Sequence, residues 1–243
     1  MFYILYCIGG EEIMNLLEKE QLIKEKSEEF EHALPEEVIR FAIDTFPNLT
    51  FACSFGAEDV VLVDMIQKIS PSTDIFYLDT DFHFKETYET RDRMAEKYGL
   101  EFVRVSPKIT PDEQSLQYGE ALWSVDANQC CNIRKVEPLT RILSNYDAWI
   151  TGVRRDQAPT RANTRKIEYD VKFGLMKFNP IASWTSDDVW QYIRTNNVLY
   201  NPLHDQNYPS IGCEHCTRQV MPGEDPRAGR WAGNEKTECG LHK

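Results

Sequence analysis

The sequence predicts an α/β fold with a mainly parallel sheet flanked by helices. Short apolar runs with the length of buried strands alternate with amphipathic helical segments between residues 49 and 153. Each pair of strands is separated by enough chain for a helical crossover, and such crossovers join parallel neighbours with right-handed geometry. At 243 residues the chain is long enough to bury a sizeable core.

The expected elements follow one another regularly. The acidic segment from Glu11 to Arg40 predicts helices that pack loosely on the main body. Strands are then expected in residues 49–55, 73–80, 100–107 and 147–153. Helices are expected in residues 57–69, 84–99 with its end at Gly99, 130–146, and 186–197 with Thr185 or Ser186 as the cap.

Three segments are expected along the chain. Residues 1–45 form an N-terminal leader with helices, and residues 46–205 form a nucleotide-binding α/β domain. Residues 206–243 are rich in glycine, proline and polar residues, and we expect them to end in a flexible tail. The apolar opening "MFYILYCIGG" is shorter than the ~20 residues of a membrane span and lacks the features of a signal peptide. These features predict a cytoplasmic protein, in which cysteines stay reduced.

The charge distribution limits the ligands. A formal net charge of −12 argues against general binding to nucleic acid or to anionic membranes. An anionic ligand therefore has to meet a local group of cations. The segment "GVRRDQAPTRANTR" and the later "PRAGRW" supply such groups, and arginine forks suit phosphate and sulfate oxygens. The alternative is a solvated basic loop. The arginines concerned are Arg154, Arg155, Arg161, Arg165, Arg227 and Arg230.

Two segments at expected strand ends are candidates for binding a nucleotide. "CSFGAED" places Ser54, Phe55 and Gly56 before a helix, where backbone N–H groups and the helix N-terminus favour an anion. The alternative is that Ser54 and Asp59 only complete the start of the helix. "LDTDFHF" ends the next strand, and ligands of such sheets lie at the carboxyl ends of the strands. The alternative, which is favoured for this segment alone, is that its acids are ordinary strand-end residues.

Four cysteines form two close pairs, Cys130 with Cys131 and Cys213 with Cys216. A four-thiolate metal site is the leading interpretation. Adjacent cysteines make a cramped chelate on one zinc ion, whereas a [4Fe–4S] cluster offers a separate iron to each, so the cluster is favoured over zinc. Lys135 and Arg134 can offset the negative charge of such a site; the alternative, favoured for Arg134, is a solvated helix face. The apolar surroundings of Cys7 and Cys53 indicate small hydrophobic residues instead.

Cys239 stands alone in the tail sequence "KTECGLHK". A lone tail thiol is usually incidental. Here His242 and the arginines of the predicted anion site favour a thiolate, which would attack an electrophile bound at those arginines.

These motifs together resemble the cluster-containing adenylyl-sulfate and phosphoadenylyl-sulfate reductases of sulfate assimilation. The similarity runs from about Phe51 to the end and rests on "SFGAED", "LDT", "ETYE", "CCNIRKVEPL", "TGVRRDQAPTRA", "IGCEHCT", "PRAGRW" and "ECGLH". It implies an adenine-nucleotide α-hydrolase-like fold. One departure is Asp81, because the family's commoner "LDTG" is "LDTD" here, so a side chain alters the expected backbone contact to the nucleotide. The implied substrate-binding residues are Ser54, Phe55, Gly56, Leu78, Thr80, Arg154, Arg155, Arg161, Arg227, Arg230 and His242.

The resemblance also implies the chemistry. Cys239 is the nucleophile, and Lys135 lies beside a [4Fe–4S] cluster. The implied cluster ligands are Cys130, Cys131, Cys213 and Cys216. The expected reaction converts adenylyl sulfate, or its 3′-phosphorylated form, to sulfite through a cysteine S-sulfonate, with thioredoxin or glutaredoxin as reductant.

Several alternatives stay open. One alternative is a reductase specific for phosphoadenylyl sulfate. A second is a tRNA-thiolating or ATP-pyrophosphatase-type enzyme on the same fold, and a third is a metal-binding regulatory module. The "SGGxDS" loop of the ATP-dependent enzymes is absent, and the regulatory module does not explain Cys239. A homo-oligomer is compatible with the sequence.

Overall fold

The computed structural model describes residues 16–231, 236, 238, 240 and 241. Their centre is a six-stranded sheet with the order β3-β2-β1-β4-β6-β5. Neighbouring strands are parallel except β5 and β6, which form an antiparallel pair at one edge. The predicted, mainly parallel sheet is confirmed. Its strands are β1 (Leu49–Ala52), β2 (Asp74–Leu78), β3 (Val103–Val105), β4 (Ala148–Ile150), β5 (Ile167–Asp170) and β6 (Leu175–Phe178).

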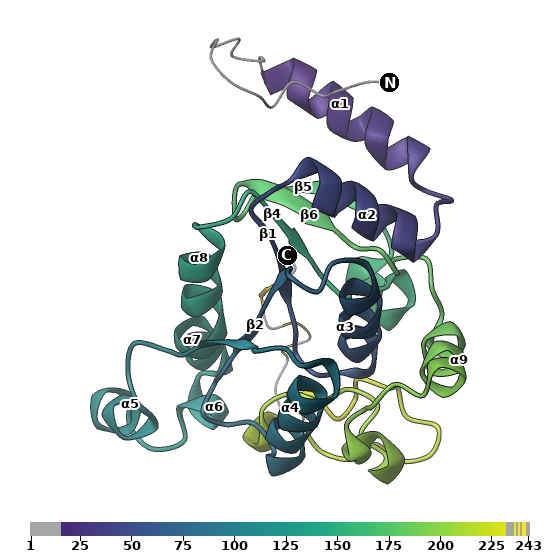
Figure 1. The fold of residues 1–243 in the computed structure, drawn as a ribbon. Coiled ribbons are helices and arrows are strands. Elements are labelled where there is room, and N and C mark those ends of the chain that lie inside the picture. The colour runs from purple at the N-terminus through teal and green to yellow at the C-terminus, as the bar shows by residue number, and fades with distance from the viewer. Residues whose placement is uncertain (1–15, 232–235, 237, 239, 242–243) are drawn as a thin grey trace.

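Helices cover both faces of this sheet (Figure 1). Side chains alternate along a strand, so Ile75 and Tyr77 of β2 join one core while Phe76 joins the other. The first core contains buried residues of α2, α3, α4 and α9, and the second contains residues of α8. The helices are α1 (Leu16–Glu29), α2 (Pro35–Thr45), α3 (Ala57–Ile69), α4 (Lys85–Tyr98), α5 (Pro111–Tyr118), α6 (Leu122–Val125), α7 (Ala127–Cys131), α8 (Glu137–Leu143) and α9 (Ser186–Asn196).

Most helix ends agree with the sequence signals. Gly99 ends α4 in the left-handed conformation, and Thr185 caps α9 by accepting a hydrogen bond from the Asp188 backbone N–H. The helix expected in 130–146 is divided, because residues Asn132–Val136 form a π-helical turn between α7 and α8. Such turns widen the helix and are frequent at functional sites.

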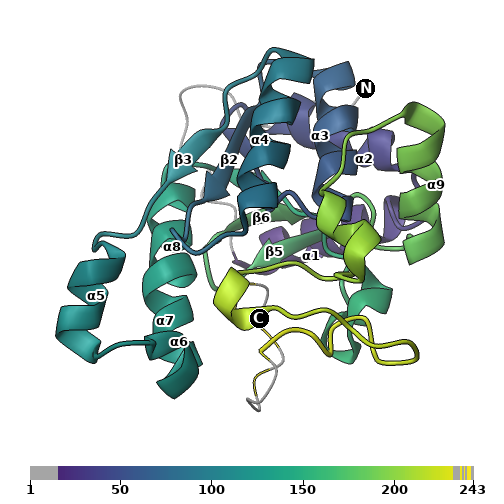
Figure 2. The ribbon, with the colours of Figure 1, turned by 90° about the horizontal axis from the view of Figure 1, so that it is seen from below.

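The segment after α9 covers one end of the sheet. Seen from below, this yellow-green to yellow part of the chain lies across the molecule in front of the strands (Figure 2). It contains the short 3₁₀ turns Pro202–Gln206 and Glu214–Cys216. At the opposite end, α1 packs against β5. The predicted segment boundaries near residues 45 and 205 stay predictions.

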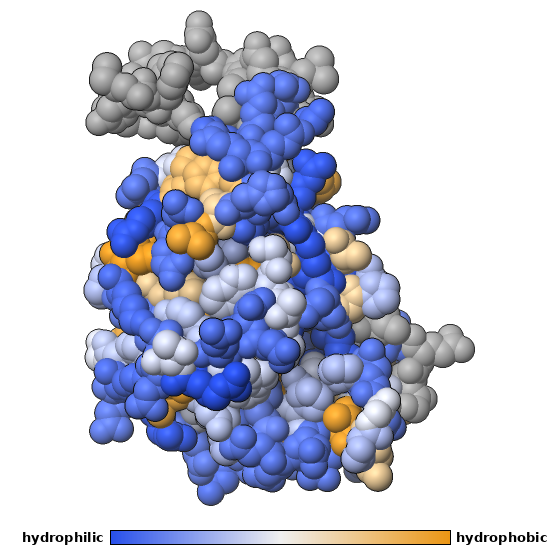
Figure 3. All heavy atoms as spheres, turned by 90° about the vertical axis from the view of Figure 1, so that its right-hand side faces the viewer, coloured by the Kyte–Doolittle hydropathy of each residue, from blue (hydrophilic) through white to orange (hydrophobic). Residues whose placement is uncertain are grey.

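The exterior is mainly hydrophilic, as expected for a net charge of −12. Figure 3 shows one face on which apolar residues occur in scattered groups among polar ones. No helix in the described part of the chain is long and apolar enough to cross a bilayer.

Candidate functional site

A cavity of about 610 Å³ opens at the carboxyl ends of the parallel strands. Its walls come from the turns after β1, β2 and β4, namely residues 52–59, residues 76–78, 80 and 83, and residues 151–154. The segment after α9 closes the other side with Arg227 and Arg230. This is the edge at which open α/β sheets bind their ligands.

The turn after β1 is tightly held. Phe55 has a φ of 61°, and the backbone N–H and hydroxyl of Ser54 both donate to Asp59 Oδ2, at 2.6 and 2.5 Å. Asp59 is buried, and burial raises its pKa to about 6 against the lowering effect of the Ser54 hydrogen bonds. Gly152 makes this arrangement fit, because a Cβ there would collide with Asp59 Oδ1. The first turn of α3 is thereby presented to the cavity.

The turn after β2 supplies the second part of the wall. Thr80 is fully buried and lines the cavity together with Leu78. The Leu78 carbonyl accepts a hydrogen bond from His83 Nε2 at 2.8 Å. Burial lowers the pKa of His83, which therefore stays a neutral imidazole next to the strand end. Both predicted nucleotide contacts thus lie at the edge of the cavity.

The arginines after β4 have different surroundings. Arg154 lines the cavity, but its Nε and Nη2 donate to Glu58 Oε1 at 3.0 and 2.8 Å. Arg161 also lines the cavity. Arg155 pairs with Glu31 at 2.6 Å and is not among the described residues that line it. The structure therefore brings two of these three predicted arginines to the cavity.

Glu238 is a site residue that the sequence analysis did not single out. Its side chain is buried and accepts hydrogen bonds from Arg161 Nε at 2.9 Å and Nη2 at 2.8 Å. Arg227 Nη2 lies 3.3 Å from the same carboxylate. Burial alone would raise the pKa of Glu238. The Arg161 hydrogen bond and the charges of Arg161 and Arg227 together outweigh burial, so the pKa is lowered overall. The only signal in the sequence was its place in "ECGLH", next to the predicted nucleophile.

A smaller cavity adjoins this one. The two are separated by three residues that border both, Lys135, Arg230 and Trp231. The Arg230 guanidinium lies 4.6 Å from the centre of the Trp231 ring, and its Nη1 donates to Ser210 Oγ at 3.0 Å. Gly212 leaves room for it, since a Cβ there would be 2.5 Å from Arg230 Nη2. Arg230, predicted beside the substrate, and Lys135, predicted beside the thiols, therefore belong to one shared wall.

The smaller cavity is lined by all four cysteines of the two predicted pairs, Cys130, Cys131, Cys213 and Cys216. The first pair ends α7, and the second flanks a 3₁₀ turn that is joined to the end of β2 by the bridge between His83 and Cys213. Phe82, Trp123 and His215 form an aromatic side, in which the Trp123 and His215 rings stack at 4.1 Å. Thr80 Oγ1 and Cys213 Sγ lie 3.4 Å apart.

Two of these thiols, Cys130 and Cys216, are held in their neutral form by their environment. Burial, followed by the neighbouring cysteines, raises the pKa of Cys130 to about 12 and that of Cys216 to about 11. The described cysteines are all free thiols. No group of three or more described His, Cys, Asp and Glu side chains is arranged to hold a single metal ion. The donors are four soft sulfur atoms around one cavity, which are the ligand type of zinc and of iron–sulfur clusters.

Two predicted residues, Cys239 and His242, lie outside the described residues, as does Cys7. Their near neighbours Gly240 and Leu241 are described. The Gly240 carbonyl accepts from Lys172 Nζ, and Leu241 packs against the core that contains Leu139 and Trp149.

The fold and site define an α/β protein of the adenine-nucleotide α-hydrolase type, with an arginine-lined cavity next to a group of thiols. The model of the phosphoadenosine phosphosulfate reductase domain matches residues 48–219, and the chain belongs to this family. It is therefore an oxidoreductase of sulfate assimilation, as the resemblance implied.

Individual relatives agree with this assignment. The chain is 52% identical over 209 residues to the adenosine 5'-phosphosulfate reductase of Lysinibacillus sphaericus. The aligned region covers 85% of this chain and 90% of the relative. It is 50% identical to adenosine 5'-phosphosulfate reductase 2 of Bacillus subtilis, over 85% of this chain and 89% of that one. Its fold matches a crystal structure of phosphoadenylyl-sulfate reductase from Candida auris with a TM-score of 0.72 and 32% identity, over 87% and 100% of the two chains. The FMN adenylyltransferase of Candida glabrata (TM-score 0.55, 15% identity, 87% of this chain and 69% of that one) shares only the fold.

Proposed function

We propose that the protein reduces adenylyl sulfate to sulfite and AMP. The observation that carries this proposal is the cavity at the carboxyl ends of the strands, which shares a basic wall with four cysteines. Relatives with 50–52% identity that are named adenosine 5'-phosphosulfate reductase support the unphosphorylated nucleotide. A reductase of phosphoadenylyl sulfate is the second candidate, supported by the likeness to the Candida auris enzyme.

The nucleotide is held by the turns after β1 and β2. Ser54, Phe55 and Gly56 border the nucleotide at the start of α3, where the helix dipole favours an anion, while the Ser54 N–H holds Asp59. Leu78 and Thr80 border the nucleotide at the end of β2. The anionic phosphosulfate is held by cations of the cavity, namely Arg154, Arg161, Arg227, Arg230 and Lys135.

Sulfur transfer proceeds at Cys239. Its thiolate attacks the sulfate sulfur, a sulfur–sulfur bond forms, and the sulfur–oxygen bond to the phosphate breaks to release AMP. The expelled phosphate gains negative charge, so fixed guanidinium groups stabilise the transition state more than the bound substrate. One thiol of reduced thioredoxin or glutaredoxin then attacks the Cys239 sulfur and expels sulfite. Its second thiol releases Cys239, and the partner leaves as a disulfide.

The four cysteines hold a [4Fe–4S] cluster in this proposal. The chemistry of the donor set supports it, as do Arg134 and Lys135 at the border of the same cavity. When bound, such a cluster contributes an electrostatic field next to the shared wall. Thiol chemistry supplies both electrons of the reaction, so the chain's own sulfur atoms and cations carry every step above.

A reducing compartment fits this use of free thiols, so we place the reaction in the cytoplasm. The segments expected from the sequence acquire roles here: residues 46–205 bind the nucleotide, and residues 206–243 supply two cluster ligands and the nucleophile.

Side-by-side turnover with the two nucleotides tests the function. We expect sulfite and AMP from adenylyl sulfate with reduced thioredoxin, and a much lower kcat/KM for phosphoadenylyl sulfate. The Cys239→Ser variant is the control and should form no sulfite. Turnover of phosphoadenylyl sulfate alone would favour the second candidate. Release of pyrophosphate from ATP, without sulfite from either nucleotide, would contradict both.

A further inference from the structure

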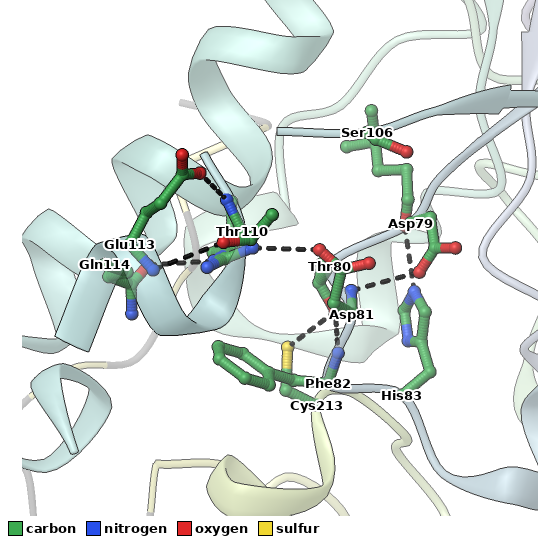
Figure 4. A network of polar contacts seen from close by, with 12 residues as sticks. Asp79, Thr80, Asp81, Phe82, His83, Ser106, Thr110, Glu113, Gln114 and Cys213 are labelled. Atoms are coloured by element: carbon green, nitrogen blue, oxygen red, sulfur yellow. Dashed lines mark hydrogen bonds and ion pairs between the residues drawn. The ribbon is translucent and has the colours of Figure 1, made fainter. Parts of the chain in front are cut away.

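Asp81 occupies a turn that is better suited to glycine. Its φ is 58°, in the left-handed region that glycine adopts without strain and most other residues avoid. Its backbone N–H donates to the side-chain oxygen Oδ1 of Asp79 at 3.0 Å, so the turn is held without the Asp81 side chain (Figure 4). The turn itself does not need a carboxylate at position 81, so the effect of this residue lies in the contacts of its side chain.

The Asp81 carboxylate joins two arginines. Oδ1 accepts from Arg104 Nη2 at 3.2 Å, and Oδ2 accepts from Arg134 Nη1 at 2.9 Å. The Arg104 side chain is 57% exposed and also pairs with Asp79, whereas the Arg134 side chain is 1% exposed. An exposed pair contributes little, but a buried guanidinium needs a carboxylate close to it. Of the two contacts of Asp81, the one with the buried Arg134 therefore contributes more than the one with the exposed Arg104.

The Arg134 guanidinium is fixed in three ways. Besides the Asp81 contact, its Nε donates to Gln114 Oε1 at 2.8 Å, and its centre lies 4.9 Å from the centre of the Phe82 ring. Its remaining nitrogen, Nη2, is buried and has no hydrogen-bond partner among the described residues. A buried charged N–H group without an acceptor is costly and uncommon. This points to an acceptor that the site receives from outside the described chain.

The cavity of the four cysteines is where that acceptor belongs. Arg134 lines it, and Gln114, which orients Arg134, also donates to Cys130 Sγ at 4.0 Å. Figure 4 shows Asp81 between Asp79 and Gln114, with Cys213 close by. Sulfur atoms of a thiolate-bound cluster are anionic and accept such hydrogen bonds, which tune the properties of the cluster.

We propose that Asp81 is a positioning residue, which fixes Arg134 so that Nη2 donates a hydrogen bond to a sulfur atom of the group held by the four cysteines. One side chain thereby links the turn after β2, which borders the substrate cavity, to the thiol site. The inference rests on the cluster of the proposed function and assigns a role to the residue at which this chain departs from the family's usual glycine.

The test compares iron release from anaerobic holoprotein to a chelator in Asp81→Gly, Arg134→Gln and the double variant. We expect several-fold faster release in Asp81→Gly, together with shifted iron–sulfur stretching bands in the resonance Raman spectrum. Glycine adopts a φ of 58° without strain, so loss of the turn cannot explain this result. The double variant should release iron no faster than Arg134→Gln alone, because both substitutions remove the same hydrogen bond.

Two further variants make the test decisive. Asp81→Asn keeps an acceptor oxygen and tolerates the turn, so it should lie between the wild type and Asp81→Gly. Asp92→Asn, on the exposed side of α4, should behave as the wild type. Wild-type release and spectra in both Asp81 variants, or additive effects in the double variant, would overturn this inference alone. A wild-type holoprotein without iron and acid-labile sulfide would overturn the proposed cofactor, and this inference with it.

Discussion

Glu238 and Arg161 form a two-pronged ion pair beside the cavity at the strand ends, with N–O distances of 2.9 and 2.8 Å and both side chains about nine-tenths buried. The pair joins the C-terminal segment to the loop after β4 across 77 residues of sequence. The guanidinium in this pair, that of Arg161, is also one of the groups to which the proposed function assigns substrate binding. Because two buried charges depend on each other, removal of either one has a large effect.

Glu238→Gln should lower the free energy of unfolding by about 2 kcal/mol, since it replaces charged hydrogen bonds to Arg161 by neutral ones. The pKa of Glu238 is lowered in the folded protein, so the stabilisation exists above the ordinary glutamate pKa and disappears as the pH falls through the folded value. Urea denaturation at pH 7.5 and at pH 3 measures the difference. The matched control is Glu224→Gln, an exposed partner of Arg218, for which we expect little change. Equal effects of the two substitutions would contradict this assignment.

Arg161→Ala should raise the KM for adenylyl sulfate about 10- to 100-fold, because a charged contact to the phosphosulfate is lost. Arg155→Ala is the comparison, since Arg155 pairs with Glu31 and is not among the described residues of the cavity wall. Its effect on KM should be several-fold smaller. Steady-state kinetics with both variants checks this, and equal losses would show that Arg155 binds the substrate as well.

Gly152→Ala should destabilise the protein by about 1–3 kcal/mol, as overpacking of a filled site does. The new Cβ would collide with Asp59 Oδ1 and lie 3.1 Å from Glu58 Cβ. In Gly56→Ala the nearest atom to the new Cβ is 3.5 Å away, which is an ordinary contact. Thermal unfolding of the two variants should therefore separate them, and a stable Gly152→Ala protein would show that the turn after β1 can rearrange.

Nucleotide affinity should rise as the pH falls from 8 to 6. The pKa of Asp59 is raised to about 6 by burial, with the charge of Glu58 raising it and that of Arg161 lowering it. An anion bound at this turn favours protonated Asp59, so binding takes up a proton and is stronger where the proton is available. Adenylyl sulfate has no group of its own that titrates in this range. Calorimetry should give a flat profile for Asp59→Asn; a pH-dependent variant would place the titrating group elsewhere.

The main sheet and its flanking helices were predictable because their signals are local. The helix predicted in residues 57–69 is found at Ala57–Ile69, since its apolar run and its turn lie within one short stretch. The hairpin of β5 and β6 was missed. Its strands are four residues each and one lies at the sheet edge, so neither shows a distinct apolar run.

The site was predictable in its residue types more than in its pairings. The sequence motifs indicated which arginines and cysteines to consider, and the structure brings most of them to two adjoining cavities. Arg155 and Arg161 look alike in the sequence, yet only tertiary packing turns one toward Glu31 and the other toward Glu238. The contact between Asp81 and Arg134 likewise joins residues that are 53 positions apart, and no local sequence pattern predicts it.

The central claim is that Cys239 receives the sulfur atom of the nucleotide. Mass spectrometry of the holoprotein, incubated with adenylyl sulfate in the absence of any thiol, tests it directly. The account predicts one SO₃ group per chain on the peptide that contains Cys239, which reduced thioredoxin then removes as sulfite. An unmodified Cys239 peptide, or an SO₃ group on another cysteine, while the enzyme still turns over, would contradict it.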